Sequence, residues 1–133
     1  MRSVILTAVL MAVLASASSA SAFTVKNVKM RSDGKRLTYS MVICTTSKAT
    51  LKLSGVFTSK SRGTRTAKPG ATQYQDKGCW PATVSVPVTR TVTKNCRSNV
   101  CTARKGRTYY GRVTVTDKKT KKSRRTSRLR TRA

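Results

Sequence analysis

Hydrophobic and polar residues alternate along most of the chain after residue 22, with the period of two that is typical of strands buried on one face. Threonine and valine, which favour strands, are abundant there, and no segment shows the 3.6-residue period of an amphipathic helix. The pattern predicts seven short strands: Phe23–Met30, Arg36–Cys44, Ala49–Phe57, a short edge strand near Thr64–Lys68, Ala82–Val92, Arg107–Asp117 and Ser123–Arg132.

The strand at Arg36–Cys44 shows the alternation well. One face carries Leu37, Tyr39, Met41 and Ile43, and the other face carries Val42 and Cys44. Apolar residues on both faces indicate a central strand that is covered on two sides. An Asp-Gly pair, Asp33-Gly34, precedes it, and this pair between strand-like runs predicts a tight turn.

Two other sequence features predict a loop and an edge strand. The range Ser59–Gln75 is polar, basic and poor in apolar residues, with Pro69-Gly70 near its end, so we expect a loop around the short edge strand. Pro87 cannot donate a hydrogen bond to a neighbouring strand, so the strand at Ala82–Val92 is expected at an edge of its sheet.

Seven short strands joined by turns predict an all-β fold, a single antiparallel β-sandwich over residues 23–133. The segment Arg107-Thr-Tyr-Tyr-Gly-Arg-Val-Thr-Val-Thr-Asp117 resembles the penultimate strand of immunoglobulin-like and fibronectin type III-like domains. The resemblance implies that Tyr109 or Tyr110 makes a corner hydrogen bond to the backbone. The chain departs from antibody domains at Trp80, which directly follows Cys79 instead of lying on a middle strand between two cysteines.

Residues 1–22 have the organisation of a secretory signal peptide. Arg2 supplies a positive start, Val4–Ala15 is an uninterrupted run of mostly apolar residues, and the segment ends Ala20-Ser21-Ala22. The apolar run is shorter than the roughly 20 residues of a membrane-spanning helix. We therefore expect cleavage before Phe23, a secreted protein, and no transmembrane segment in the mature chain.

All four cysteines, Cys44, Cys79, Cys96 and Cys101, lie after the expected cleavage site. An even number of cysteines in a small exported chain predicts disulfides, and four cysteines allow three pairings. We favour Cys96–Cys101, which closes a four-residue loop, and this leaves Cys44–Cys79. The absence of a Cys-x-x-Cys spacing argues against zinc. Trp80 is expected to pack against a disulfide rather than to bind a sugar.

The charge is strongly unbalanced. The chain has 29 Lys and Arg residues, 3 Asp, no Glu and no His, and a net charge of +26. Without His or Glu, most acid–base and metal-dependent chemistry is unavailable, so we expect no enzyme activity, no cofactor and no metal. The Ser32-x-x-Lys35 spacing contains the Asp-Gly turn, whereas acylating enzymes place that motif on a helix.

The basic residues are densest near the C-terminus. The segment 118–132 has nine of them and no acidic residue: Lys118, Lys119, Lys121, Lys122, Arg124, Arg125, Arg128, Arg130 and Arg132. The lysines are expected at a hairpin tip. In a continuous strand from Ser123 to Arg132, Arg124, Arg128, Arg130 and Arg132 would share one face, with Arg125 and Leu129 on the other.

These features favour a basic secreted protein that binds an acidic polymer or an anionic cell surface. No element that reads bases is visible, so sequence-specific nucleic-acid binding is not expected. Two structural alternatives remain open, a disordered basic tail of residues 118–133 and charge that protects an edge strand from pairing. The alternative function is inhibition of a trypsin-like protease by the Cys96–Cys101 loop, which carries Arg97.

Overall fold

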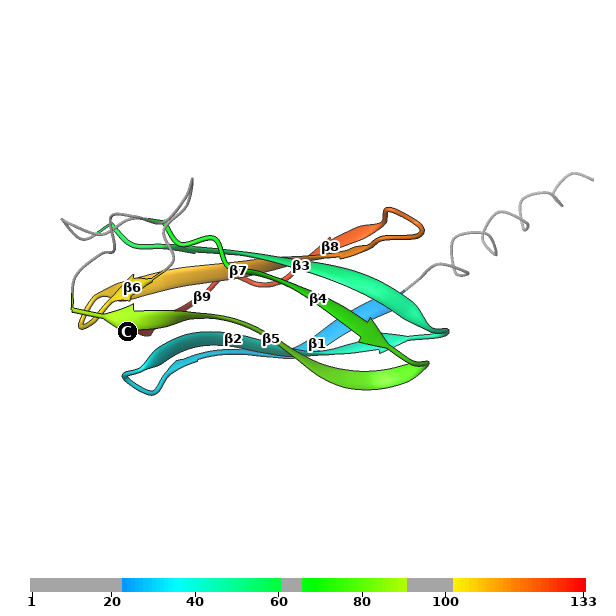
Figure 1. Ribbon diagram of the computed structural model, residues 1–133, viewed down its shortest axis with the longest axis horizontal. Coiled ribbons are helices and arrows are strands. Elements are labelled where there is room, and N and C mark those ends of the chain that lie inside the picture. The colour runs from blue at the N-terminus through cyan, green and yellow to red at the C-terminus, as the bar shows by residue number, and fades with distance from the viewer. Residues whose placement is uncertain (1–22, 61–65, 91–101) are drawn as a thin grey trace, which may run out of the picture.

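The computed structural model describes residues 23–60, 66–90 and 102–133, which form two β-sheets. The sheets face each other as two layers (Figure 1). The four-stranded sheet has the order β1 (Phe23–Ser32), β2 (Arg36–Thr45), β5 (Gly78–Thr89) and β6 (Ala103–Arg104). The five-stranded sheet has the order β4 (Gly70–Gln75), β3 (Ala49–Thr58), β7 (Thr108–Asp117) and β8 (Ser123–Arg125), and β9 (Leu129–Arg132) also pairs with β7.

The all-β class is confirmed for the described residues, and so is the inward face predicted for the strand at Arg36–Cys44. Alternate side chains of both sheets fill the space between the layers, as in other sandwiches. In β2 the predicted inward residues are all buried, and β2 is central because it pairs with both β1 and β5. The largest fully buried side chains are Tyr39, Tyr109, Phe57, Leu37, Met41, Ile43, Leu51, Leu53, Val113 and Val115.

A bulge in β1 keeps its apolar residues on the core side. Lys26 pairs with Val42 and Lys29 pairs with Ser40, so Asn27 and Val28 together oppose one residue of β2. Asn27 has a positive φ of 54°, which this extra residue requires. The inserted residue shifts the alternation by one position. Phe23 before the bulge and Met30 after it are therefore both buried, although their spacing in the sequence is odd.

The β1–β2 turn is the one that the Asp-Gly pair predicts. The Asp33 carboxylate accepts hydrogen bonds from the backbone N–H groups of Lys35 and Arg36, both at 2.8 Å. Gly34 has a φ of +86°, a conformation that glycine adopts without a steric penalty. These backbone hydrogen bonds lower the pKa of Asp33 below its ordinary value of 3.8.

The edge position expected from Pro87 holds for most of β5, although the end of this strand pairs with β6. The Val88 N–H donates at 2.8 Å to the carbonyl of Lys35, which directly precedes β2, so the position before Val88 faces away from β2. Strand β6 pairs only with Val88 and Thr89, which leaves most of β5 at the edge of the sheet.

The predicted loop over Ser59–Gln75 is wrong for its second half, because Gly70–Gln75 forms β4 on β3. The short strand expected near Thr64–Lys68 is reduced, within the described residues, to one bridge between Phe57 and Ala67. The sequence did not predict β4 because its residues are mostly polar. An edge strand buries few of its own side chains, so it needs no alternation of apolar residues. Hydrogen bonds to β3, which sequence patterning does not show, hold it in the sheet.

Two further differences concern strand number and direction. The described residues form nine strands where seven were expected, because β4 and the two-residue β6 had no apolar pattern and the C-terminal strand is divided. The sandwich is not wholly antiparallel, since β5 and β6 run parallel at Val88↔Ala103 and Thr89↔Arg104. Strand β6 has only two residues, which is too short for an alternation of apolar and polar residues, so the sequence could not predict its parallel pairing with β5.

The corner hydrogen bond is made by Tyr109. Its hydroxyl accepts the backbone N–H of Arg104 at 2.8 Å, and its ring is fully buried. The bond joins the start of β7 to the β6 segment five residues earlier. It resembles the tyrosine corner of immunoglobulin-like sandwiches, in which a tyrosine hydroxyl bonds the backbone just upstream.

The Cys44–Cys79 disulfide is present and joins directly paired residues of β2 and β5. Cys96 and Cys101 lie outside the described residues, as does the loop of the proposed protease inhibitor. The expectation that Trp80 packs against a disulfide is not met at Cys44–Cys79. Adjacent strand residues point to opposite faces, so Trp80 and the Cys79 sulfur lie on different sides of β5, and the Trp80 side chain is 45% exposed.

Candidate anion-binding surface

The lysines of the C-terminal segment form the turn between β7 and β8, as predicted. Asp117 organises this turn. Its backbone N–H donates to the Lys122 carbonyl at 2.8 Å and its carbonyl accepts the Lys121 N–H at 2.8 Å. Its carboxylate accepts the Lys119 N–H at 2.9 Å. All four lysine side chains at the tip are exposed, namely Lys118, Lys119, Lys121 and Lys122.

The strand expected from Ser123 to Arg132 is broken after Arg125. Thr126 turns inward and is buried, and it makes two hydrogen bonds with Val113. The Thr126 N–H donates to the Val113 carbonyl, and the Thr126 hydroxyl accepts the Val113 N–H, both at 2.9 Å. The next carbonyl, of Ser127, accepts the hydroxyl of Tyr39 at 2.6 Å. The break is therefore fixed by both sheets.

This break changes which arginines share a face. Arg125 pairs with Thr114, Arg130 pairs with Tyr110, and Arg132 pairs with Thr108. Paired residues project to the same side of a sheet, and here it is the solvent side, because the alternate residues of β7 are buried. The prediction that Arg124 joins this face and that Arg125 opposes it is therefore wrong.

Arg124 and Arg128 each lie over an aromatic ring. The Arg124 guanidinium is 5.8 Å from the ring centre of Phe23, and the Arg128 guanidinium is 4.6 Å from that of Tyr110. Arg124 pairs with Val115 and so projects toward the core side, where it covers an end of the core. Arg128 lies on the solvent side with Tyr110. Stacking holds a guanidinium in place and leaves its N–H edges available for an anion.

Four arginines thus gather on the solvent face of the five-stranded sheet. We call Arg125, Arg128, Arg130 and Arg132 the outer arginine face; all four are exposed. Neighbouring strands add Lys52 and Arg112 to the same side. The Nε atom of Arg112 is buried and has no hydrogen-bond partner among the described residues.

The charges on this face have few internal counterions. The whole chain holds 3 acidic residues against 29 basic ones, and two of the three, Asp33 and Asp117, accept backbone N–H groups in their own turns. Arg130 and Arg132 are two positions apart on one strand, about 7 Å. That distance is within the Debye length of about 8 Å at physiological salt. The arginines therefore repel one another.

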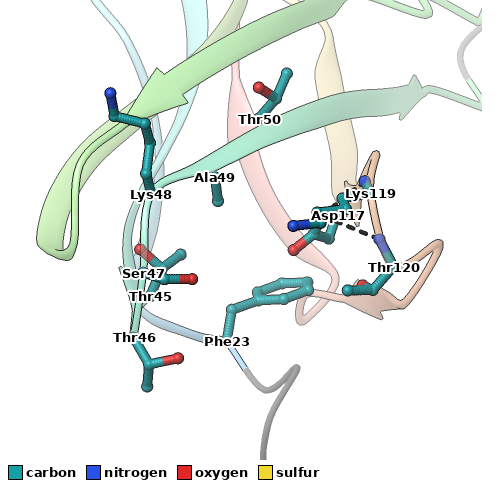
Figure 2. A pocket seen from close by; sticks show the side chains of 10 residues that line it. All are labelled: Phe23, Thr45, Thr46, Ser47, Lys48, Ala49, Thr50, Asp117, Lys119 and Thr120. Atoms are coloured by element: carbon teal, nitrogen blue, oxygen red, sulfur yellow. Dashed lines mark hydrogen bonds between the residues drawn. The ribbon is translucent and has the colours of Figure 1, made fainter.

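A depression of about 490 Å³ lies beside the lysine turn. Figure 2 shows residues of the β2–β3 turn along one wall, including Ser47 and Lys48, and Asp117 and Lys119 at the other, with the Phe23 ring between them. The sequence-based expectations did not include this hollow. Its walls come from three separate segments, and only pairing of their strands brings them together.

A second feature that the sequence did not predict lies at the same end of the sandwich. Tyr74 of β4 and Trp80 of β5 are 78% and 45% exposed, and both line a depression of about 470 Å³. The sequence around Tyr74 contains a signal that its ring is exposed. In β4, Tyr74 is the one large apolar residue in an otherwise polar run, so it has no apolar neighbours at alternate positions.

The described ranges contain neither a metal-binding cluster nor a membrane-spanning helix. No group of three His, Cys, Asp or Glu side chains lies close enough there to hold a metal ion. Nor does any helix in those ranges have the length and apolarity needed to cross a membrane.

The fold and this surface define a class, a small all-β sandwich protein with a strongly basic sheet face. No protein-family model matches the chain, and no curated protein matches it in sequence. Among solved structures, the chain is similar to Bacteroides uniformis β-glucuronidase 2 covalently bound to cyclophellitol-6-carboxylate aziridine, and to Bacteroides uniformis β-glucuronidase. Identities are 18% and 17%, and the TM-score is 0.41 for both. The likeness covers 83% of this chain but 12% of each enzyme.

Proposed function

We propose that the protein is exported and binds acidic polymers or anionic cell surfaces by electrostatic attraction. In this proposal, residues 1–22 are a signal peptide that is removed before Phe23. Only Arg2 among the charged residues is lost, so the mature chain keeps 28 basic and 3 acidic residues and a net charge of +25. Outside the cell, such a charge attracts polyanions and accelerates their encounter with the protein.

The observation that carries the proposal is the outer arginine face on a rigid sheet. Its backbone is held by pairing to β7, by the two Thr126–Val113 hydrogen bonds and by the Tyr39 hydroxyl. An arginine that is already positioned loses less side-chain entropy on binding than one in a flexible tail. Guanidinium groups also present paired donors that match carboxylate, sulfate or phosphate oxygens.

The experiment compares two variants with the same loss of charge. One replaces Arg125, Arg128, Arg130 and Arg132 with Gln. The control replaces four exposed basic residues elsewhere with Gln, namely Lys26, Lys29, Lys35 and Lys77. Binding to heparin and to inorganic polyphosphate is measured by titration at several salt concentrations.

We expect the arginine variant to lose at least tenfold more affinity than the control. The slope of log K against log salt concentration should become shallower by about one unit for each arginine that contacts the polymer. Equal losses in the two variants would show that total charge, and not this face, is responsible. Affinity that does not change with salt would contradict the electrostatic mechanism itself.

A further inference from the structure

One end of the sandwich is hollowed by three adjoining depressions. The β2–β3, β4–β5 and β7–β8 turns all lie at this end, on the right in Figure 1. The depression beside Trp80 and a middle one of about 330 Å³ share residues 74–76, and the middle one shares residues 48–50 with the depression beside Phe23. We call these three adjoining depressions, from Trp80 to Lys119, the end groove.

The first section of the end groove is aromatic. Tyr74 and Trp80 both line it, although each ring is substantially exposed. The indole N–H of Trp80 donates to the Asp76 carbonyl at 3.0 Å, which fixes the orientation of the ring. An exposed aromatic ring that is held in place by its polar atom offers a rigid flat contact at a low entropic cost.

Polar groups surround these rings. Gln73, Gln75 and Asp76 line the same section. The buried Gln75 amide donates to the Ile43 carbonyl at 3.1 Å, and its oxygen accepts the Gln73 amide at 2.8 Å, so both side chains are held. Amide and carboxylate oxygens accept hydrogen bonds from hydroxyl groups. A flat apolar surface with acceptors at its side suits a hydroxyl-bearing ring.

The far section of the end groove carries two lysines and one carboxylate, that of Asp117, which already accepts the Lys119 N–H at 2.9 Å. Lys48 and Lys119 stand on its two walls, contributed by the β2–β3 turn and by the β7–β8 turn (Figure 2). Lys48 also lines the middle depression, which continues to Tyr74. Along its length, the groove therefore changes from aromatic and hydrogen-bonding to cationic.

We propose that the end groove binds an acidic polysaccharide in which uncharged sugar rings alternate with anionic ones. An uncharged ring lies against Trp80 and Tyr74 and donates hydroxyl hydrogen bonds to Asp76, and an anionic ring lies between Lys48 and Lys119. This inference rests on the proposed function and names the chemical class of its polyanion. The aromatic section of the groove would favour this polysaccharide over a polymer that has negative charges but no rings.

A single-stranded nucleic acid also offers rings and negative charge. It carries a phosphate at every nucleotide, however, so each base that stacks on Trp80 brings a phosphate close to the Asp76 carboxylate. A polymer with charge on every second ring avoids that repulsion. The Asp76 carboxylate therefore favours the sugar polymer.

The test uses hyaluronan oligosaccharides, which carry one carboxylate for every two rings, beside inorganic polyphosphate and poly(dT). Trp80 is the single tryptophan of the chain, so its fluorescence reports directly on the groove in the unmodified protein, and isothermal titration measures the affinity of every variant. The variants are Tyr74→Ser and Trp80→Leu. Tyr74 is 78% exposed, so its replacement removes little packing. Val56→Ala is the control, since Val56 is 42% exposed on the outer face of β3, away from the groove.

We expect hyaluronan to shift the Trp80 emission, and each aromatic variant to bind it at least fivefold more weakly, as for other contact residues with a large share of the binding energy. Their affinity for polyphosphate, and all affinities of Val56→Ala, should stay unchanged. Aromatic variants that bind hyaluronan as tightly as the unmodified protein would overturn the groove and leave the proposed function standing. An equal loss for poly(dT) would replace the sugar by a nucleic acid, and a protein that binds none of the three polymers would overturn both proposals.

Discussion

The hydroxyl of Tyr39 donates a 2.6 Å hydrogen bond to the carbonyl of Ser127, 88 residues later in the chain. Tyr39 belongs to the four-stranded sheet, and Ser127 lies in the break between β8 and β9 at the edge of the other sheet. The bond therefore ties the arginine-bearing segment to the opposite layer of the sandwich. A C-terminal segment with nine basic residues is held in this way as part of the fold instead of a free tail.

Replacement of Tyr39 by Phe tests this link. The variant removes the hydroxyl and leaves the Ser127 carbonyl without that donor, so the free energy of unfolding should fall by about 1–3 kcal/mol. Urea unfolding at pH 7 measures it. Tyr74→Phe is the matched control because its ring is exposed, and it should be neutral. A Tyr39→Phe protein as stable as the unmodified one would show that the bond contributes nothing.

The same residue predicts an alkaline limit. Burial raises the pKa of Tyr39 above its ordinary value of 10.0, while Thr126 and Arg112 oppose that shift. A raised pKa in the folded state means that its contribution is complete below pH 10 and is lost as the pH rises through the folded pKa. The stability difference between the unmodified protein and Tyr39→Phe should therefore shrink above pH 10. A difference that stays constant to pH 12 would contradict this account.

Gly111 of β7 should tolerate no side chain. A Cβ atom there would lie 2.7 Å from Cε of Met30 and 2.8 Å from Cδ1 of Phe57, both in the core. We expect Gly111→Ala to lose about 1–3 kcal/mol of unfolding free energy through overpacking. Gly70→Ala is the control in a strand, because its Cβ would meet only the Leu53 carbonyl at 3.5 Å. Similar thermal midpoints for both variants would contradict the prediction.

The Cys44–Cys79 disulfide closes a 35-residue separation. Cys44→Ala with Cys79→Ala should lower the free energy of unfolding by about 2–4 kcal/mol, because the unfolded chain gains freedom when the link is removed. The double variant Ser40→Ala with Thr83→Ala is the control, since that pair lies opposite in the same β2–β5 ladder without a covalent bond. A loss no larger than that of the control would show that the strand pairing alone suffices.

Asp33 gives the protein a measurable acid dependence. Its pKa is lowered by the Arg36 and Lys35 backbone hydrogen bonds, so their contribution is present above pH 3.8 and is lost as the pH falls through the lower folded pKa. Asp33→Ala should lower the thermal midpoint at pH 7, and the gap to the unmodified protein should narrow near pH 2. A gap of equal size at both pH values would rule out the carboxylate as its source.

The sequence by itself determined the all-β class, the inward residues of the strand at Arg36–Cys44, the β1–β2 turn and the lysine-rich hairpin tip. These features depend on neighbours in the chain. Alternation has a period of two wherever a strand buries one face, and the Asp33-Gly34 turn makes its own hydrogen bonds. The Cys44–Cys79 pairing was reached by elimination, and the structure contains it.

Tertiary structure alone decided the arrangement of the candidate site. Strand β4 exists because β3 pairs with it, and the arginines face as they do because Val113 and Tyr39, distant in sequence, hold Thr126 and Ser127 out of the strand. A shift of the strand register by one residue reverses which side chains face the solvent. Arg125 therefore faces the solvent and Arg124 the core side, the reverse of the prediction. Likewise, Trp80, Tyr74 and Lys119 share one groove only because antiparallel pairing brings three turns to the same end, and no local pattern records which turns will meet.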